Sequence, residues 1–199
     1  FAALTNFTQG DLTPFPKSRG ELVHGFLNGR LSVKDYALSI KGDQYAGFNL
    51  LLFDGRHLLH TTNVSQPDQP RSRLLPAGDY GLSNAELGAT WPKCVDGANR
   101  LGVLADGDHT NHQLIELLND QEKPADERLP KRGVPIERER HLASCFISDS
   151  QYGTRASTVV RMGRKEIYFA EQTYLPEGVP GPKVEFEFAV ETVDASAEG

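Results

Sequence analysis

Three asparagines stand in or beside stretches whose residue pattern predicts strands, where asparagine is disfavoured. They are Asn6, Asn49 and Asn84. A buried carboxamide needs hydrogen-bond partners, so one interpretation is that each side chain satisfies local backbone at a strand end or turn. The other interpretation is catalytic, because an asparagine N–H held in place binds a developing oxyanion. For a single asparagine the local interpretation is the favoured one.

One arginine is framed by small residues. Arg155 lies in the stretch Tyr-Gly-Thr-Arg-Ala-Ser-Thr, directly before an apolar run. Small neighbours would let the guanidinium enter a cleft, where its planar fork holds a carboxylate or an oxyanion in a fixed geometry. An ordinary surface arginine is the alternative.

The histidines do not complete a metal-binding motif. His109 and His112 would share a helix face, but a metal site needs at least one further ligand, and no cysteine or carboxylate motif supplies it. Solvated residues at a helix start are the favoured interpretation. His57 and His60 follow a hairpin turn and are expected on opposite faces of a strand, which argues against joint ligation. No metal is predicted.

The two cysteines are far apart in the sequence. Cys94 is expected on a helix and Cys145 in an apolar strand, and neither has a neighbouring His–Asp pair. Buried, reduced and inert thiols are expected for both, in a reducing compartment such as the cytoplasm.

The elements that must position these side chains alternate between helices and strands. Strands are predicted at 1–7, 48–53, 57–62, 80–82, 141–148, 157–162, 166–174 and 183–190, and helices at 19–28, 32–40, 92–104 and 112–118. Loops are predicted at 63–73 and at 120–139, the latter a long, mobile surface segment. This order predicts a single α+β domain over 1–190, with helices packed on antiparallel sheets, and a disordered tail at 191–199.

Composition limits the classes of partner. The chain has 199 residues, 38 % apolar and 24 % charged, with a net charge of −6. The acidic balance argues against nucleic acid and against acidic membrane surfaces. No run approaches the roughly 18 apolar residues of a membrane span, and no basic-then-apolar leader is visible. A small-molecule ligand or substrate is the expected partner, and the oligomeric state is left open.

Five peptides occur in a recognisable order: FAALTNF, SRGELVHGFL, YAGFNLLLFD, YGLSNAELGATWPK and YGTRASTVV. Together they resemble the transport and Golgi organisation family, also called NRDE after an Asn-Arg-Asp-Glu motif. That family resembles the N-terminal-nucleophile hydrolases. The resemblance therefore implies a four-layer αββα sandwich of two stacked antiparallel sheets flanked by helices.

The resemblance also implies a mechanism. In such enzymes an N-terminal cysteine attacks an amide carbonyl, and its own α-amine serves as the base. This chain has no Met-Cys start and no Asn-Arg-Asp-Glu motif, and Phe1 has no nucleophilic atom, so the nucleophile is expected outside the chain. The matching positions would place Asn6 beside the nucleophile, make Asn84 an oxyanion donor, and bring Arg155 close to the catalytic cysteine.

Two functions from different classes follow. The first is an amidohydrolase that acts on a C–N or acyl bond and needs no cofactor. The alternative is a non-catalytic binding or trafficking protein for haem or for a lipid or acyl ligand. In that case an apolar cleft would hold the ligand and Arg155 would pair with its carboxylate.

Overall fold

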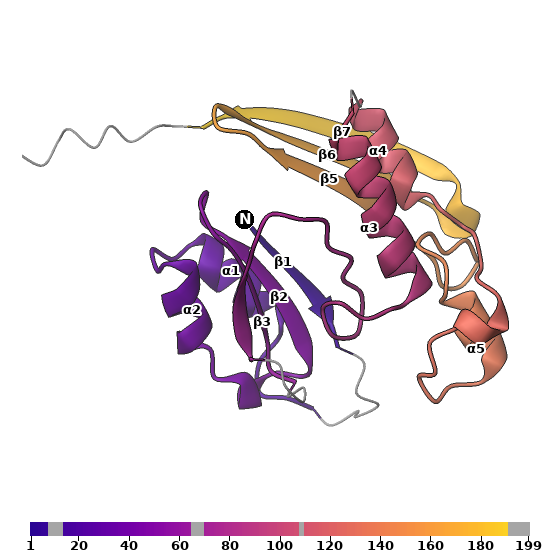
Figure 1. Cartoon of the computed structure of the whole chain (residues 1–199), viewed down its shortest axis with the longest axis horizontal. Coiled ribbons are helices and arrows are strands. Elements are labelled where there is room, and N and C mark those ends of the chain that lie inside the picture. The colour runs from indigo at the N-terminus through magenta and orange to yellow at the C-terminus, as the bar shows by residue number, and fades with distance from the viewer. Residues whose placement is uncertain (8–13, 65–69, 108–109, 191–199) are drawn as a thin grey trace, which may run out of the picture. The chain divides into compact units, whose positions relative to one another are not determined.

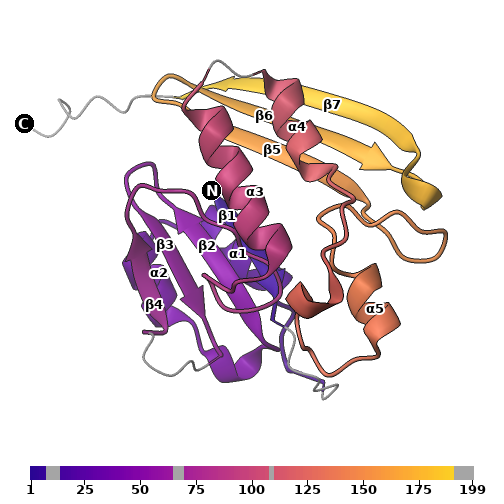
Figure 2. The ribbon, with the colours of Figure 1, turned by 45° about the vertical axis from the view of Figure 1, so that its right-hand side comes forward.

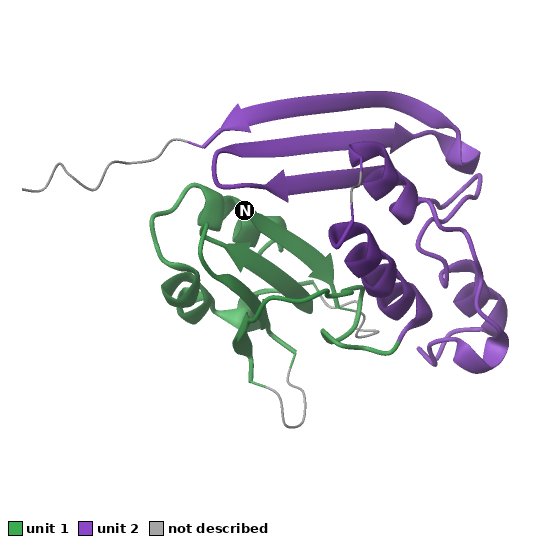
Figure 3. Cartoon of the chain, turned by 45° about the horizontal axis from the view of Figure 1, so that its top comes forward, with its two compact units in different colours: residues 1–90 green, residues 91–199 purple. Residues whose placement is uncertain are grey.

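A computed structural model describes residues 1–7, 14–64, 70–107 and 110–190 of the chain. It has a mixed α+β architecture with two antiparallel sheets and several helices (Figure 1). Two compact units divide it, residues 1–90 and 91–199, and each contains one sheet with its own helices (Figure 3). The expected tail at 191–199 lies outside the described residues.

The first unit, termed unit 1, is built on a four-stranded sheet in the order β1-β2-β3-β4, with antiparallel neighbours. Its elements are β1 (Ala2–Asn6), α1 (Gly20–Leu27), α2 (Val33–Ser39), a 3₁₀ turn (Gly42–Gln44), β2 (Phe48–Phe53), β3 (Leu58–Thr62) and β4 (Ser72–Leu75). The strand predicted at 80–82 was wrong. The fourth strand is β4 instead, because the edge of β3 pairs with a segment whose proline-rich neighbourhood had indicated a loop.

Helices α1 and α2 of unit 1 cover one face of its sheet (Figure 2). Phe48, Leu50 and Leu52 alternate along β2, so all three point to that face and are fully buried. They pack with Leu22 of α1 and with Val33 of α2, among others. Both helices were predicted from the spacing of their apolar residues, and the structure confirms them.

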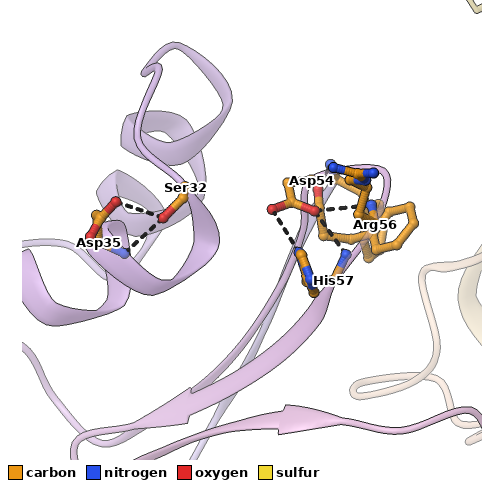
Figure 4. A network of polar contacts seen from close by, with 7 residues as sticks. Ser32, Asp35, Asp54, Arg56 and His57 are labelled. Atoms are coloured by element: carbon orange, nitrogen blue, oxygen red, sulfur yellow. Dashed lines mark hydrogen bonds and ion pairs between the residues drawn. The ribbon is translucent and has the colours of Figure 1, made fainter.

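The β2–β3 hairpin was predicted from its Asp54-Gly55 turn, and the turn forms as expected. Asp54 Oδ1 accepts hydrogen bonds from the backbone N–H groups of Arg56 and His57, at 3.0 and 2.8 Å (Figure 4). Gly55 has φ of +95°, a conformation that favours glycine. Figure 4 also shows Ser32, which caps α2 by accepting the N–H of Asp35.

The second unit, termed unit 2, carries a three-stranded sheet in the order β5-β6-β7. Its elements are α3 (Pro92–Ala105), α4 (Asn111–Leu118), a 3₁₀ turn (Asp126–Arg128), α5 (Ile136–His141), β5 (Ala156–Met162), β6 (Glu166–Tyr174), a 3₁₀ turn (Pro176–Gly178) and β7 (Pro180–Ala189). Ile115 of α4 packs on Val159, Tyr168 and Ala170, which share one face of the sheet.

The other face of this sheet is largely apolar, with Thr158 bonded to Glu171 toward one end. Strand pairing and alternation place one set of side chains there: Val160, Met162, Ile167, Phe169, Val184, Phe186 and Phe188. We call this set the apolar face. Phe186 and Phe188 are each about half exposed, and their rings stack with centroids 6.1 Å apart.

Two expectations for unit 2 were wrong. Residues 141–148 do not form a strand, because Phe146 N–H donates to Asp120 O at 2.7 Å and turns the chain into an irregular loop that contains Cys145. Residues 120–139 are not only a surface segment, since Glu139 is buried and pairs with Arg132.

No helix within the described ranges is long and apolar enough to cross a membrane.

Candidate functional site

The structure brings Asn6 and Asn84 together at the end of β1. The Asn84 side-chain N–H donates to the backbone oxygen of Asn6 at 2.9 Å. Phe1 exchanges two hydrogen bonds with Phe53, and Phe7 N–H donates to the β2 side of the sheet. Alternation then directs the Asn6 carbonyl away from β2, toward the outer edge of β1. Asn84 thus binds β1 at the position where a further strand would pair.

Side chains of the sheet hold the backbone on both sides of Asn84. Thr5 Oγ1 donates to Ser83 O at 2.7 Å. Asn49 Nδ2 donates to Ala85 O at 2.8 Å and to Thr5 Oγ1 at 3.2 Å. Asn49 is fully buried, and it shares with Thr5 the sheet face opposite α1 and α2. The Asn84 backbone is therefore anchored through both of its neighbours.

His60 completes this group. Its Nε2 lies 3.0 Å from Asn49 Oδ1, and because a carbonyl oxygen only accepts, Nε2 carries the proton. Burial, and then the charge of Arg73, lower the pKa of His60 to about 4. Arg73 faces His60 across β3 and β4, and it donates to Leu87 O at 3.2 Å. His60 is consequently neutral at pH 7.

We call Thr5, Asn49, His60 and Arg73 the polar network of unit 1. Sequence reasoning noted Asn49 as unusual but did not connect it to His60. The signal was present in the hairpin: the β2–β3 register pairs Leu51 with His60, so Asn49 and His60 are diagonal neighbours on one face.

Arg155 belongs to unit 2, directly before β5, whereas Asn6 and Asn84 belong to unit 1. Its backbone oxygen accepts the N–H of Tyr174 at 2.8 Å, which extends the β5–β6 ladder by one residue. The side chain is exposed, and no partner for it occurs among residues whose positions are described. Thr154, beside it, accepts the N–H of Ile147.

Both cysteines are free thiols in unit 2. Burial is the main cause that raises the pKa of Cys94 and of Cys145 above the usual range. Lys93 lies near both, and its Nζ donates to Leu142 O at 3.0 Å. Protonated thiols are poor nucleophiles, which agrees with the expectation that these cysteines are inert.

The histidine pair of the sequence is only half described, because His109 lies outside the described residues. His112 is exposed on α4, with its Nε2 3.3 Å from Glu116. Over residues 1–7, 14–64, 70–107 and 110–190, no three histidine, cysteine or acidic side chains are grouped so that they could hold a metal ion.

The fold and this site define an α+β protein with a polar site at a strand edge. A family model described as Transport and Golgi organisation 2 matches residues 1–176. The homolog of that name from Mus musculus is 30% identical over 191 residues, covering 87% of this chain and 68% of the mouse protein. The Bos taurus homolog is 31% identical over 192 residues, with the same coverage, and the Homo sapiens homolog is 32% identical over 176 residues, covering 80% and 62%. The chain belongs to the transport and Golgi organisation 2 family.

Proposed function

We propose that this chain supplies the oxyanion wall of an N-terminal-nucleophile hydrolase that cleaves an amide or acyl bond. The nucleophile would come from a residue outside the chain. One observation carries the proposal: the side-chain amide of Asn84 is anchored at the outer edge of β1, beside Asn6. Both positions match those that the family resemblance implies for the nucleophile pocket.

The hydrogen-bond count at Asn84 supports this role. Its amide nitrogen carries two N–H groups, and one donates to Asn6 O. No partner for the second is found within the described part of the chain. That N–H would donate to the oxyanion of a tetrahedral intermediate. The Asn6 side chain shares the helix-covered face with Phe48, so Asn6 contributes through its backbone oxygen, which holds Asn84. Donors fixed before the reaction stabilise this charge without reorganisation.

Arg155 would bind a substrate carboxylate or orient the nucleophile. Support comes from its exposed guanidinium and from the small residues around it, Gly153, Thr154 and Ala156. A planar guanidinium forms paired hydrogen bonds with a carboxylate, which a lysine in its place would not reproduce.

We also propose the four-layer sandwich. Each sheet has its helices on one face and some large apolar side chains on the other. In unit 1 the second face carries Leu51 and Phe53 beside the polar network, and in unit 2 it is the apolar face. Two sheets stacked through these faces would bury both.

The two free thiols support a cytoplasmic location for the protein.

The test uses the natural gene product that contains this chain, assayed against panels of acyl amides and acyl thioesters. Asn84→Ala should lower kcat by about a hundredfold or more, as expected for loss of one oxyanion donor. Asn28→Ala, at the exposed end of α1, is the matched control and should leave kcat unchanged. Equal rates for Asn84→Ala and the natural protein would exclude the proposed role.

A second candidate function, binding of haem or of a lipid or acyl ligand, is favoured by the apolar face. Its half-exposed Phe186 and Phe188 offer aromatic surface to an apolar ligand. Titration of haem into the purified protein should then shift the Soret band, and an alkyl carboxylate should displace a fluorescent fatty acid. Without a Soret shift at micromolar protein the haem version is excluded, and without displacement the lipid version is excluded.

A further inference from the structure

We propose that Asn49 and His60 are positioning residues that hold Asn84 in place for hydrolysis. This inference rests on the proposed function and adds to it two residues that lie on β2 and β3, away from the edge where Asn84 binds Asn6. Neither is offered as a group that touches the substrate.

The hydrogen-bond count of Asn49 assigns it this role. Its two N–H groups donate to Ala85 O and Thr5 Oγ1, and its Oδ1 accepts from His60. The carboxamide is fully buried and has no N–H left for a substrate. Any influence on catalysis must therefore pass through the Ser83–Ala85 backbone.

Ala85 O, which can only accept, fixes the orientation of that carboxamide. If the Asn49 amide rotated by half a turn, Ala85 O would face an oxygen, whereas in the observed orientation Asn49 Oδ1 accepts from His60 Nε2–H. Only the observed orientation satisfies Thr5, Ala85 and His60 together.

The segment that carries Asn84 depends on these side chains for its conformation. Residues 79–90 form no helix or strand, so the backbone supplies few hydrogen bonds of its own there. The sheet instead accounts for three of its carbonyls: Thr5 binds Ser83 O, Asn49 binds Ala85 O and Arg73 binds Leu87 O. Loss of the central bond should let Asn84 move relative to β1.

The experiment compares His60→Leu and Asn49→Leu with His60→Gln in the natural gene product. Leucine keeps the apolar volume but removes the donors, whereas the glutamine amide nitrogen reaches a position similar to Nε2 and donates to Asn49 Oδ1. His57→Leu, on the same hairpin but exposed, is the matched control. Amide hydrogen exchange, kcat and KM are measured for each.

Both leucine variants should increase exchange at residues 83–87 by about tenfold, because the local opening energy falls. They should lower kcat by about tenfold or more with KM changed less than twofold. The reason is that the displaced Asn84 N–H would have bonded to the oxyanion, which forms only in the transition state. His60→Gln should restore exchange and kcat, which a general packing role for His60 would not predict. His57→Leu should alter neither.

The outcomes separate the two proposals. Unchanged exchange at residues 83–87 in both leucine variants would overturn the positioning role. A reduced kcat in Asn84→Ala with natural kcat in His60→Leu and Asn49→Leu would overturn it also, while the proposed function stood. Increased exchange with no effect of Asn84→Ala on hydrolysis would support the anchoring and overturn the oxyanion role of Asn84. Should the leucine variants not fold, Thr5→Val decides in the same way, since it removes the bond to Ser83 O at nearly constant volume.

Discussion

The sheets of the two units differ on the faces opposite their helices. In unit 1 this face carries the polar network, with Asn49 and His60 buried and hydrogen-bonded. In unit 2 it is the apolar face, with Phe186 and Phe188 half exposed. Buried polar groups add little net stability even when they are satisfied, whereas apolar area stabilises wherever it is removed from water. The comparison therefore favours the proposed positioning role for the face of unit 1 and the proposed ligand contact for the face of unit 2.

The largest effect should come from the buried ion pair between Arg132 and Glu139. This pair lies in unit 2 but outside its sheet. Arg132 Nη2 is 2.7 Å from Glu139 Oε2, and Trp91 lies against the guanidinium with 5.1 Å to the ring centroid. Glu139→Gln leaves the arginine buried without its counter-charge, which should lower the free energy of unfolding of unit 2 by about 3–5 kcal/mol. Urea denaturation measures it. Glu137→Gln, exposed on the same helix, should cost under about 0.5 kcal/mol, and equal effects would contradict the assignment.

Acid should destabilise unit 1 through the polar network. The pKa of His60 is about 4 in the folded chain, below the ordinary value of 6.5. The unfolded chain therefore binds this proton first, and stability that is complete above pH 6.5 is lost as pH falls toward 4. The loss should reach about 3 kcal/mol.

Urea denaturation between pH 7 and pH 4 gives the free energy of unfolding of the natural chain and of His60→Gln at each pH. The difference between the slopes of these two free energies against pH is the contribution of His60. The natural chain should lose more stability than the variant. His57→Gln should keep the natural slope, because its side chain is exposed. Parallel curves for the natural chain and His60→Gln would show that His60 does not stay neutral in the folded state.

The apolar face should contribute to stability in proportion to its buried area. Phe186→Ser removes a half-buried aromatic side chain that contacts Phe169 and Phe188, and should cost about 2 kcal/mol in thermal or urea denaturation. Val103→Ser on α3, which is mostly exposed, is the control and should be close to neutral. A neutral Phe186→Ser would mean that this ring buries little area in the folded chain.

The smallest effects should be similar in the two units. Ser32 caps α2 in unit 1, and Thr110 caps α4 in unit 2 with a reciprocal bond from its backbone to Gln113. Ser32→Ala and Thr110→Ala should each cost about 1 kcal/mol in denaturation experiments, because an N–H of the first turn loses its acceptor. Ser39→Ala, near the end of α2, is the control. A large difference between the two caps would point to a role for one of them beyond its helix.

Elements with strong local signals could be predicted from the sequence. The hairpin around Asp54-Gly55, the cap at Ser32 and the alternating strand β6 each depend on residues close in the chain. Strand β4 and the loop around Cys145 could not, since the first exists only because β3 offers it an edge and the second because Asp120 O binds Phe146 N–H. In both cases a distant partner outweighed the local pattern.

For the candidate site, the sequence by itself determined that Asn6, Asn84 and Arg155 were the side chains to examine, through the peptides around them. Only the tertiary structure decided that Asn84 binds the Asn6 backbone and that Asn49 and His60 hold its flanks. The reason is that a buried amide takes its orientation from every partner at once. Those partners come from β1, β2, β3 and the segment after β4, and meet only when the sheet has formed.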